Sequence, residues 1–420
     1  MKQTLDDWLK WQETLHTSEI DLGLDRIRQV ANNLNLLNPL FPIITVAGTN
    51  GKGSSVALLE SILIAQGYIT GSYTSPHLLS YNERIKLNAI NASDQQIIDS
   101  FKKIDKARGK ITLSYFEFGT LAAILLFKKQ NVDVAILEVG LGGRLDAANL
   151  WDTSLAIITS IAIDHETWLG NNREVIAKEK SGIMRHNSPV ISGDFDPPKT
   201  IKSEAHRVGA HLYQINTDFS FKIIDGQSWE WVDDKTRYIL PHPSLNGDFQ
   251  LNNAATVIAG LHTIQQQLPT SIDAIKKGLL NASIIGRLQI INENPEWLID
   301  VAHNPHSAKA LSKHMDQHPS SGKTYALFSM LKDKDIQKVL AIMEHHIDEW
   351  HIVEIEGSRG LSLVELKIRM KKASLSGNII SHDNFSKAIE NLKKRIKNKD
   401  KVVAFGSFLV VSQVMENWEV

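Results

Sequence analysis

The sequence predicts a two-domain α/β protein whose N-terminal domain carries a phosphate-binding loop on a parallel sheet. Apolar strands alternate with helical stretches along most of the chain, which is typical of a parallel sheet with crossover helices. A glycine-rich loop stands between an apolar strand and an apolar helix near residue 50, and a fresh β/α series starts after residue 297. With 420 residues and 42% hydrophobic content, the chain can bury a large core and exceeds one ordinary domain.

The phosphate-binding loop follows the stretch Ile43 to Ala47, which is apolar or β-branched and indicates a buried strand. Glycines, one lysine and hydroxyl residues fill positions 48–55, and a helix is expected over 55–66, where Gly67 would end it. The glycines would let backbone N–H groups point inward, Lys52 would add charge for the β/γ-phosphates, and a hydroxyl could reach Mg²⁺. The sequence therefore predicts a nucleotide at the N-terminus of this helix.

This loop departs from the common phosphate-loop motif. Val46 stands where that motif has glycine, and Gly53 separates Lys52 from Ser54. The alternative is an ordinary glycine-rich turn with a surface lysine, but the strand before and the helix after it favour the phosphate site.

Composition limits the class of partner. The 46 basic and 47 acidic residues give a net charge of −1, so nothing draws the chain to nucleic acid or to an anionic membrane. No cysteine is present, which excludes disulfides, thiolate catalysis and Cys-based zinc sites and suits a reducing cytoplasm. Because the first ten residues lack an apolar leader and no later run approaches a membrane span, we expect a soluble cytoplasmic protein.

The first domain is expected to continue the strand and helix alternation. Residues 4–37 are predicted to be helical in pieces. Strands are expected at 43–47, 69–73, 132–139 and 155–161, and helices at 55–66, 94–106, 115–129, 246–266 and 271–281. Between 187 and 240 short alternating stretches suggest a small β element on this domain.

The second domain is predicted from the renewed β/α series, with strands at 297–302, 324–330, 350–355 and 401–406. The boundary is placed near 284–289, giving domains 1–285 and 286–420. The charged run 393–400 is interpreted as a solvated helix end.

The first candidate site residue beyond the loop is Glu138. Parallel strands place ligand groups at their carboxyl ends, so the loops after 43–47, 132–138 and 155–161 should meet around one nucleotide. Glu138 lies inside the apolar end of its strand, where an ionised carboxylate is costly unless a cation such as Mg²⁺ compensates it. The alternative is an exposed glutamate at a frayed strand end.

Two further candidates follow the third strand. His165, next to Asp164, falls at that strand's carboxyl end, and its neutral imidazole could ligate a metal. Lys180 lies on a helix with Lys178 and Glu179, and from the residues alone a solvated lysine is the favoured interpretation.

Polar residues also cluster in the connection 73–85 and near the domain boundary. The connection taken alone is an ordinary surface loop. Asn253 opens an apolar helix, Arg287 sits at the hinge, and Asp300 ends a buried strand. An arginine and an aspartate on opposite sides of a cleft could hold the two ends of a nucleotide as the cleft closes.

The order of these motifs resembles the bacterial bifunctional dihydrofolate synthase/folylpolyglutamate synthase family of the Mur ligase superfamily, over nearly the whole chain. The matching positions are 48–54, 75–77, 117, 138, 142–146, 164–165, 180, 253, 287 and 300–305. The resemblance implies a Mur-ligase-type P-loop domain that holds ATP and a Rossmann-like C-terminal domain that helps close the cleft and receive glutamate. Segment 142–146 is similar to the bifunctional subgroup, although Ala148 replaces a threonine common before Asn149.

The resemblance also implies roles for individual residues. Lys52, Glu138, His165 and Lys180 would be catalytic, and Ser75, Glu138 and His165 would ligate two Mg²⁺ ions, with a possible monovalent cation. Lys180 matches a carbamylated lysine, whose carbamate would support the metal centre, and this reverses the solvated interpretation. ATP contacts are implied for Thr49, Asn50, Gly51, Lys52, Gly53, Ser54, Asn253, Arg287 and Asp300.

The acceptor and glutamate sites are implied in the same way. Dihydropteroate or folate would be lined by Ser114, Tyr115, Phe116, Glu117, Leu145, Asp146 and Ala147, and His303 would lie in the glutamate cleft. The implied partners are small molecules only, namely ATP, L-glutamate, dihydropteroate and reduced folates, and a monomer is expected.

The implied reaction is ATP-dependent amide ligation. ATP would convert a carboxylate to an acyl phosphate, and the glutamate amine would displace phosphate. Alternatives are a ligase with only one of the two activities, another Mur-superfamily amino-acid ligase, or a nucleotide-binding regulator without ligase activity. Cell-wall Mur ligases are similar but carry roughly 100 residues of nucleotide-sugar domain before the P-loop, where this chain has 42 residues before its first strand.

Overall fold

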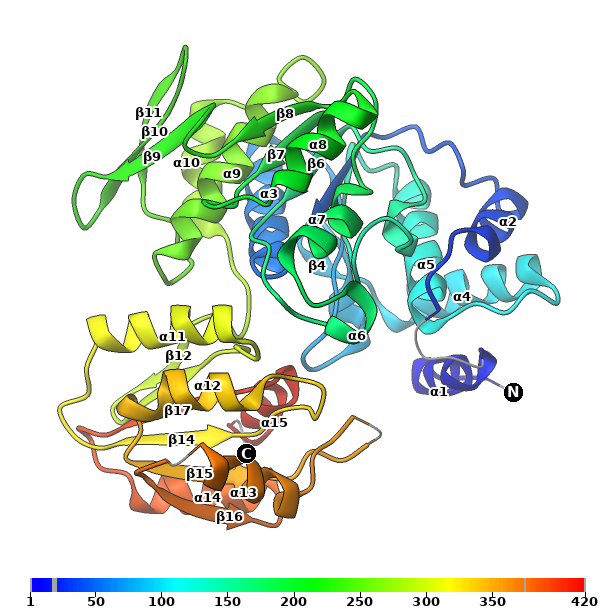
Figure 1. Ribbon diagram of the computed structural model, residues 1–420. Helices are drawn as coiled ribbons and strands as arrows, with labels where there is room; N and C mark the ends of the chain where they lie inside the picture. Colours follow the sequence, from blue (N-terminus) through cyan, green and yellow to red (C-terminus); the bar gives the residue numbers. More distant parts are fainter. Residues whose placement is uncertain (1, 17–20, 358, 374, 419–420) are drawn as a thin grey trace. The chain divides into compact units, whose positions relative to one another are not determined.

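The computed structural model describes residues 2–16, 21–357, 359–373 and 375–418. The chain divides into two compact units, shown in Figure 1. Unit 1 comprises residues 1–244 and 250–283, and unit 2 comprises residues 245–249 and 284–420. Among the described residues, no helix has the length and apolar character needed to cross a membrane.

Unit 1 is built on an eight-stranded sheet with the order β4-β3-β2-β5-β1-β6-β7-β8. Its strands are β1 (Ile43–Ala47), β2 (Thr70–Tyr73), β3 (Ile85–Leu87), β4 (Ile90–Asn91), β5 (Val134–Glu138), β6 (Leu155–Ile158), β7 (Pro189–Ser192) and β8 (His211–Gln214). The six strands from β2 to β8 in this order pair in parallel, whereas β3 and β4 pair antiparallel at one edge. This parallel core confirms the predicted fold class.

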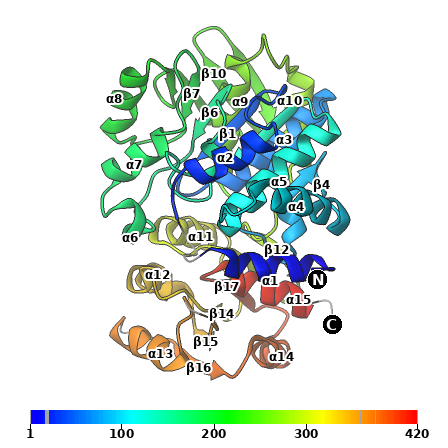
Figure 2. The same ribbon diagram turned by 90° about the vertical axis from the view of Figure 1, so that its right-hand side faces the viewer.

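Helices cover both faces of this sheet. They are α1 (Leu5–Leu15), α2 (Asp25–Asn33), α3 (Lys52–Gln66), α4 (Asp94–Arg108), α5 (Tyr115–Gln130), α6 (Glu166–Leu169), α7 (Arg173–Ser181), α8 (Lys199–Val208), α9 (Phe249–Thr263) and α10 (Ile272–Asn281), with short 3₁₀ helices η1 (Tyr81–Arg84) and η2 (Ala147–Asn149). Figure 2 shows α2 beside α4 and α5.

Side-chain alternation assigns each helix layer to a face. Ala135 and Leu137 of β5 belong to the core formed with α1, α2, α4 and α5. The opposite face meets α3 and α9, because Ser72 of β2 bonds Glu60 of α3 and Gly260 of α9 lies against Leu155. Successive side chains of a strand point to opposite faces, and Glu138 lies one residue beyond Leu137. Glu138 is therefore on the face of the sheet that α3 and α9 cover.

Several predicted boundaries change in unit 1. Strand 43–47 is confirmed, but the following helix begins at Lys52 rather than at residue 55, and the strand predicted over 155–161 ends at Ile158. The small β element is a three-stranded antiparallel sheet of β9 (Phe219–Ile223), β10 (Ser228–Asp233) and β11 (Arg237–Pro241). The rest of 187–240 was interpreted wrongly, because β7 and β8 extend the parallel sheet and α8 connects them. The residues of β8 alternate in burial because β8 is the edge strand of that sheet.

Unit 2 contains a six-stranded sheet with the order β12-β13-β17-β14-β15-β16, parallel except for the β12–β13 pair. Its strands are β12 (Gln289–Glu293), β13 (Glu296–Ile299), β14 (Thr324–Phe328), β15 (Glu349–Val353), β16 (Asn378–His382) and β17 (Lys401–Phe405). Its helices are α11 (Pro305–Gln317), α12 (Ile336–Met343), η3 (Glu344–His346), α13 (Leu363–Lys372), α14 (Phe385–Arg395) and α15 (Phe408–Trp418).

Two features of unit 2 were missed. Strands β12 and β16 are partly exposed edge strands, so their sequences lack the continuous apolar run that identified the central strands. The charged run 393–400 is not wholly solvated, because Asp400 is buried and accepts backbone N–H bonds from Lys323 at 2.9 Å and Lys397 at 2.8 Å.

Close packing of α3 against α10 gives a test of unit 1. A Cβ at Gly278 would lie 2.4 Å from the Ile62 Cα, so Gly278→Ala should cost about 1–3 kcal/mol by overpacking. The measurement is the thermal unfolding midpoint. Gly226→Ala is the control because nothing lies within 4 Å of its added Cβ, and equal midpoints for both variants would contradict the packing account.

Candidate active site

The loop between β1 and α3 depends on two glycines. Gly48 has φ +146°, and a Cβ there would lie 1.7 Å from the Thr159 Oγ1 atom. Gly51 caps α3 in the left-handed region at φ +91°, and its Cβ would lie 2.6 Å from the Asn253 Oδ1 atom. A side chain at either position would disrupt the turn, so the sequence pattern reflects a steric requirement.

The same loop is fastened to the segment that follows β6. The Thr49 backbone N–H donates to the Ser160 carbonyl at 2.7 Å, and the Thr49 hydroxyl accepts the Ala162 N–H at 3.0 Å. The Asn50 carbonyl accepts the Thr159 hydroxyl at 2.7 Å. These bonds fix the loop beneath the first turn of α3, where the backbone N–H groups of Gly53 and Ser54 have no intrahelical acceptor and provide an anion site.

Two lysines converge on the carbonyl of Gly48. Lys52 Nζ lies 3.2 Å from it, and Lys180 Nζ lies 2.8 Å from it. Lys180 is 4% exposed, so the solvated interpretation from the residues alone was wrong. Burial, followed by the charge of Lys52, lowers the pKa of Lys180 from 10.5 to about 7. Helix α7 can bury this lysine because it packs tightly on Gly143, whose Cβ would lie 2.8 Å from the Glu179 carbonyl.

Carboxylates balance part of this positive charge. Asp146 and Asp164 both favour the protonated form of Lys180. Asp146 is buried and accepts N–H bonds from Leu141 at 2.8 Å and Ala148 at 2.9 Å. Burial nevertheless raises the pKa of Asp146 to about 6. The site therefore contains a buried amine and a buried carboxyl group that both titrate near neutrality.

Glu138 lies at the end of the neighbouring strand β5, opposite Val46 of β1. It is 5% exposed, which excludes the exposed alternative, and its carboxylate accepts the Ser75 backbone N–H at 3.2 Å. The structure thus brings the predicted Ser75 to the predicted Glu138. Their strands β2 and β5 are adjacent and parallel, so both loops leave the sheet at one edge.

His165 follows the segment fastened to the phosphate loop. It adopts the left-handed conformation at φ +52° before α6, and its backbone N–H donates to the Asp164 carboxylate at 2.8 Å. Because β6 pairs with β1 on the side opposite β5, the loops carrying Lys52, Glu138 and His165 come from three adjacent strands. The topology therefore supports the predicted gathering of these residues.

Asn253 reaches the phosphate loop from α9. Besides its approach to Gly51, its amide donates to Gln250 at 2.9 Å, and Gln250 donates to the Ser54 hydroxyl at 3.2 Å. Gln250 was not among the residues predicted for the site. Its spacing of three residues from Asn253 on a helix was the available signal, because such residues share one helix face.

The predicted acceptor segments also meet. A Cβ at Gly140 would lie 2.8 Å from the Phe116 ring and 3.3 Å from Asp146, so the segments 114–117 and 145–147 adjoin. Ser114 and Glu117 form the capping box of α5, and the Glu117 carboxylate also accepts a hydrogen bond from the Arg26 guanidinium at 3.3 Å. These two side chains therefore order the segment, while Tyr115 and Phe116 are its ring-bearing members.

The remaining predicted residues lie in unit 2. Asp300 is buried and accepts N–H bonds from Leu288 at 2.8 Å and Ala302 at 2.7 Å, and burial raises its pKa against the charge of Arg287. The Arg287 guanidinium lies 5.2 Å from the centre of the Phe408 ring, and the centre of the His303 ring lies 6.1 Å from the centre of the same Phe408 ring. The prediction that Arg287 and Asp300 lie on opposite sides of a cleft was wrong, because both residues belong to unit 2. Arg287 precedes β12 and Asp300 follows β13, and these two strands pair antiparallel, which brings the two residues together.

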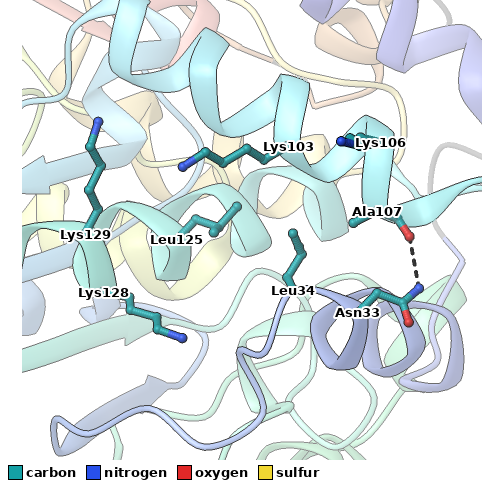
Figure 3. A pocket seen from close by; sticks show the side chains of 8 residues that line it. All are labelled: Asn33, Leu34, Lys103, Lys106, Ala107, Leu125, Lys128 and Lys129. Atoms are coloured by element: carbon teal, nitrogen blue, oxygen red, sulfur yellow. Dashed lines mark hydrogen bonds between the residues drawn. The ribbon is translucent and has the colours of Figure 1, made fainter.

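A cavity of about 590 Å³ lies elsewhere in unit 1, as Figure 3 shows. It is lined by Asn33, Leu34, Lys103, Lys106, Ala107, Leu125, Lys128 and Lys129. These residues gather at the C-terminal ends of α2, α4 and α5, where lysines balance the negative ends of the helix dipoles. The cavity is at the end of α5 opposite to Ser114 and Glu117, so it is separate from the predicted acceptor residues.

Family models match both parts of the chain. The Mur ligase middle domain matches residues 46–261, and the Mur ligase glutamate ligase domain matches residues 286–408. The fold and the phosphate loop thus define a P-loop ligase of the Mur type.

Full-length relatives narrow the family. The chain is 42% identical to dihydrofolate synthase/folylpolyglutamate synthase of Escherichia coli, covering 98% of this chain and 95% of the relative. It is 41% identical to the protein of that name from Haemophilus influenzae, covering 97% and 96%. The chain therefore belongs to the dihydrofolate synthase/folylpolyglutamate synthase family of Mur ligases, which confirms the family and the ligase class predicted from the sequence.

Solved structures agree with this assignment. E. coli FolC in complex with DHPP and ADP matches with a TM-score of 0.94 and 41% identity, covering 99% of this chain and 98% of that chain. A bifunctional folylpolyglutamate synthase/dihydrofolate synthase with Mn, AMPPNP and L-glutamate bound matches with a TM-score of 0.91 and 42% identity, covering 100% and 98%.

The depressed pKa of Lys180 predicts a pH dependence of stability. Its folded pKa of about 7 lies below its ordinary value of 10.5, so between these values the unfolded chain binds a proton that the folded chain has released. Raising the pH from 7 to 9 should therefore stabilise the wild-type chain by up to about 2 kcal/mol relative to Lys180→Met. Thermal unfolding in buffers free of carbon dioxide measures this difference.

The matched control for this measurement is Lys178→Met, which changes an exposed lysine on the same helix. It should keep the wild-type pH dependence. If Lys180→Met shows the same dependence as the wild-type chain, the buried amine is not the group responsible.

Proposed function

We propose that this chain is a bifunctional ATP-dependent ligase that adds L-glutamate to 7,8-dihydropteroate and to the γ-carboxylate of folates, releasing ADP and phosphate. The observation that carries the proposal is the convergence of Lys52 and Lys180 on the Gly48 carbonyl. Beside it, the buried Glu138 ends the neighbouring strand.

The ligands of the relatives support the substrates. FolC of E. coli is solved with DHPP and ADP, and a second bifunctional relative is solved with Mn, AMPPNP and L-glutamate. At about 40% identity over the whole chain, we extend these ligand classes to this protein, namely a nucleotide, a divalent metal, glutamate and a pteroate acceptor.

The chain's own residues suit phosphoryl transfer to a carboxylate. The first turn of α3 and the Lys52 ammonium would hold the nucleotide phosphates, with Thr49 to Ser54 and Asn253 shaping the loop. The acceptor carboxylate would attack the γ-phosphorus, ADP would leave, and the glutamate amine would then displace phosphate from the acyl phosphate. The protein contributes positioning, charge and exclusion of water rather than a covalent intermediate.

The residues at the sheet edge also fit a magnesium site. Carboxylate oxygens are ligands that Mg²⁺ prefers, and the buried Glu138 lies one strand from the phosphate loop. We therefore assign Ser75, Glu138 and His165 to hold Mg²⁺, with two ions and a possible monovalent cation as in the sequence prediction. When bound, Mg²⁺ would neutralise phosphate charge during transfer.

Lys180 is assigned as a carbamylated lysine. Addition of carbon dioxide requires the neutral amine, and burial lowers the pKa of Lys180 to about 7, so this form is well populated at neutral pH. The carbamate would be an anion next to Lys52 and would support the metal centre.

We propose the acceptor and glutamate contacts that the sequence predicts. Tyr115, Phe116, Leu145 and Ala147 would line the pteroate or folate, and Asp146 would use its remaining acceptor capacity on the pterin. Ser114 and Glu117 would hold this segment in place through the α5 capping box. In unit 2, Arg287 and Asp300 are assigned to the nucleotide and His303 to glutamate.

We keep the division into an ATP-binding domain, 1–285, and a glutamate ligase domain, 286–420, and we propose a cytoplasmic monomer. The alternative within the family is a chain that retains only one of the two synthase activities.

Glutamate-dependent ADP release with dihydropteroate and with tetrahydrofolate as separate acceptors tests the proposal. We expect release with both acceptors, because one activated carboxylate chemistry serves both. Release with one acceptor would leave a single activity, and release with neither would overturn the ligase assignment.

Glu138→Gln should lower kcat at least about 100-fold while keeping the unfolding midpoint, since the neutral amide cannot balance a cation.

Carbamylation has its own test. Lys180→Ala should lose most activity, and added short carboxylates should restore part of it by occupying the place of the carbamate anion. Lys178→Ala serves as the exposed control on the same helix. Absence of rescue, together with absence of a carbon dioxide mass increment on the native lysine, would contradict the assignment.

A further inference from the structure

A cluster of metal-ligating side chains lies in unit 2 and plays no part in the function proposed above. Asp316, His345 and His346 each offer one ligand atom, and these three atoms all lie within 4.8 Å of one another. The Asp316 Oδ1 atom is 4.0 Å from His345 Nε2 and 3.8 Å from His346 Nε2. We propose that this cluster, the Asp316 site, binds a divalent transition-metal ion of the zinc class.

The scaffold holds the ligands in place. Asp316 lies in the last turn of α11, and the two histidines end η3, which directly follows α12. Met315, which precedes Asp316 on α11, and Met343, the last residue of α12, are buried in the same core cluster. Backbone positions on two packed helices are therefore fixed before any ion arrives, so little ordering is needed on binding.

The donor set selects the class of metal. Two imidazole nitrogens and one carboxylate oxygen suit Zn²⁺, Co²⁺ or Ni²⁺, whereas Mg²⁺ prefers oxygen ligands alone. Zinc bonds of about 2.0–2.1 Å place tetrahedral donors roughly 3.3–3.4 Å apart. The separations of 3.8 and 4.0 Å from Asp316 would shorten by about 0.4–0.7 Å on binding. The ligand atoms of the two imidazoles, which lie within 4.8 Å of each other, would also close on the ion. Water would complete the shell, because Asp316 and His345 are more than 60% exposed.

Neighbouring groups add support for a bound cation. The His346 side chain is 9% exposed, and its Nε2 shares a hydrogen bond of 2.9 Å with the Ser312 hydroxyl that a bound ion would replace. Ser312 precedes Asp316 by four residues on α11, so its hydroxyl can turn to the Asp316 carboxylate when the ion takes the imidazole nitrogen. The site also lies at the C-terminus of α11, where the helix dipole favours positive charge.

Cobalt binding to the untagged full-length chain tests the proposal. Protein freed of metal by chelation is titrated with Co²⁺ in excess Mg²⁺, and we expect one equivalent with visible d–d absorption that Zn²⁺ displaces. Zn²⁺ should also raise the thermal midpoint. His345→Ala and Asp316→Asn should each weaken Co²⁺ binding at least about tenfold, since loss of even an outer-shell partner costs 10–100-fold.

Two control variants make the result specific. His318→Ala changes the nearby His314–His318 stack, whose rings are 4.3 Å apart, and should leave Co²⁺ binding unchanged. Glu138→Gln should also leave it unchanged, which separates this ion from the proposed magnesium centre. Binding retained by the His345→Ala, Asp316→Asn double variant, or lost in His318→Ala or Glu138→Gln, would overturn the proposal. Mg²⁺-dependent ligation should be equal in the wild-type chain and His345→Ala, so this test does not depend on the ligase proposal.

Discussion

The turn at Gly48 is the constraint on which the rest of the candidate site depends. Because no Cβ is present, the backbone passes within contact of Thr159, and its carbonyl becomes available to two lysines. Thr49 is hydrogen-bonded to Ser160 and Ala162, so the phosphate loop is joined directly to the segment leading to His165. A side chain at Gly48 would displace the loop and both ammonium groups together.

Burial then decides how these groups behave chemically. A lysine on the exposed face of α7 would keep its ordinary pKa, whereas the same residue beneath the loop faces a second cation and little water. Glycines make that burial possible, since Gly143 lets the 140–146 loop approach the Glu179 carbonyl and Gly182 lies against the Arg144 backbone. The glycine run after β5 is thus a packing device for α7 as well as a turn.

The sequence was sufficient for the architecture because the central strands are apolar on both faces and the loop glycines are locally required. Partly exposed strands at sheet edges, such as β8, β12 and β16, lack that signal and were missed or misassigned. The burial of Lys180 could not be derived from α7 alone, because Lys178 and Glu179 share its polar character and only the partner loop decides which residue is covered. The joint placement of Arg287 and Asp300 depends on tertiary packing in the same way, so residue patterns alone cannot reveal it.

The charges around Gly48 also decide which protonation state of Lys180 a bound ligand would favour. Nucleotide phosphates alone would bring negative charge to the two lysines and favour the protonated, unreactive form of Lys180. Positive charge held by Glu138 and its neighbours would have the opposite effect, favouring the neutral amine and then its carbamate. A lysine with a pKa of about 7 is poised between these influences. Nucleotide phosphates and a bound cation would therefore act on Lys180 in opposite directions, and the balance between them would set how much of its neutral amine is available.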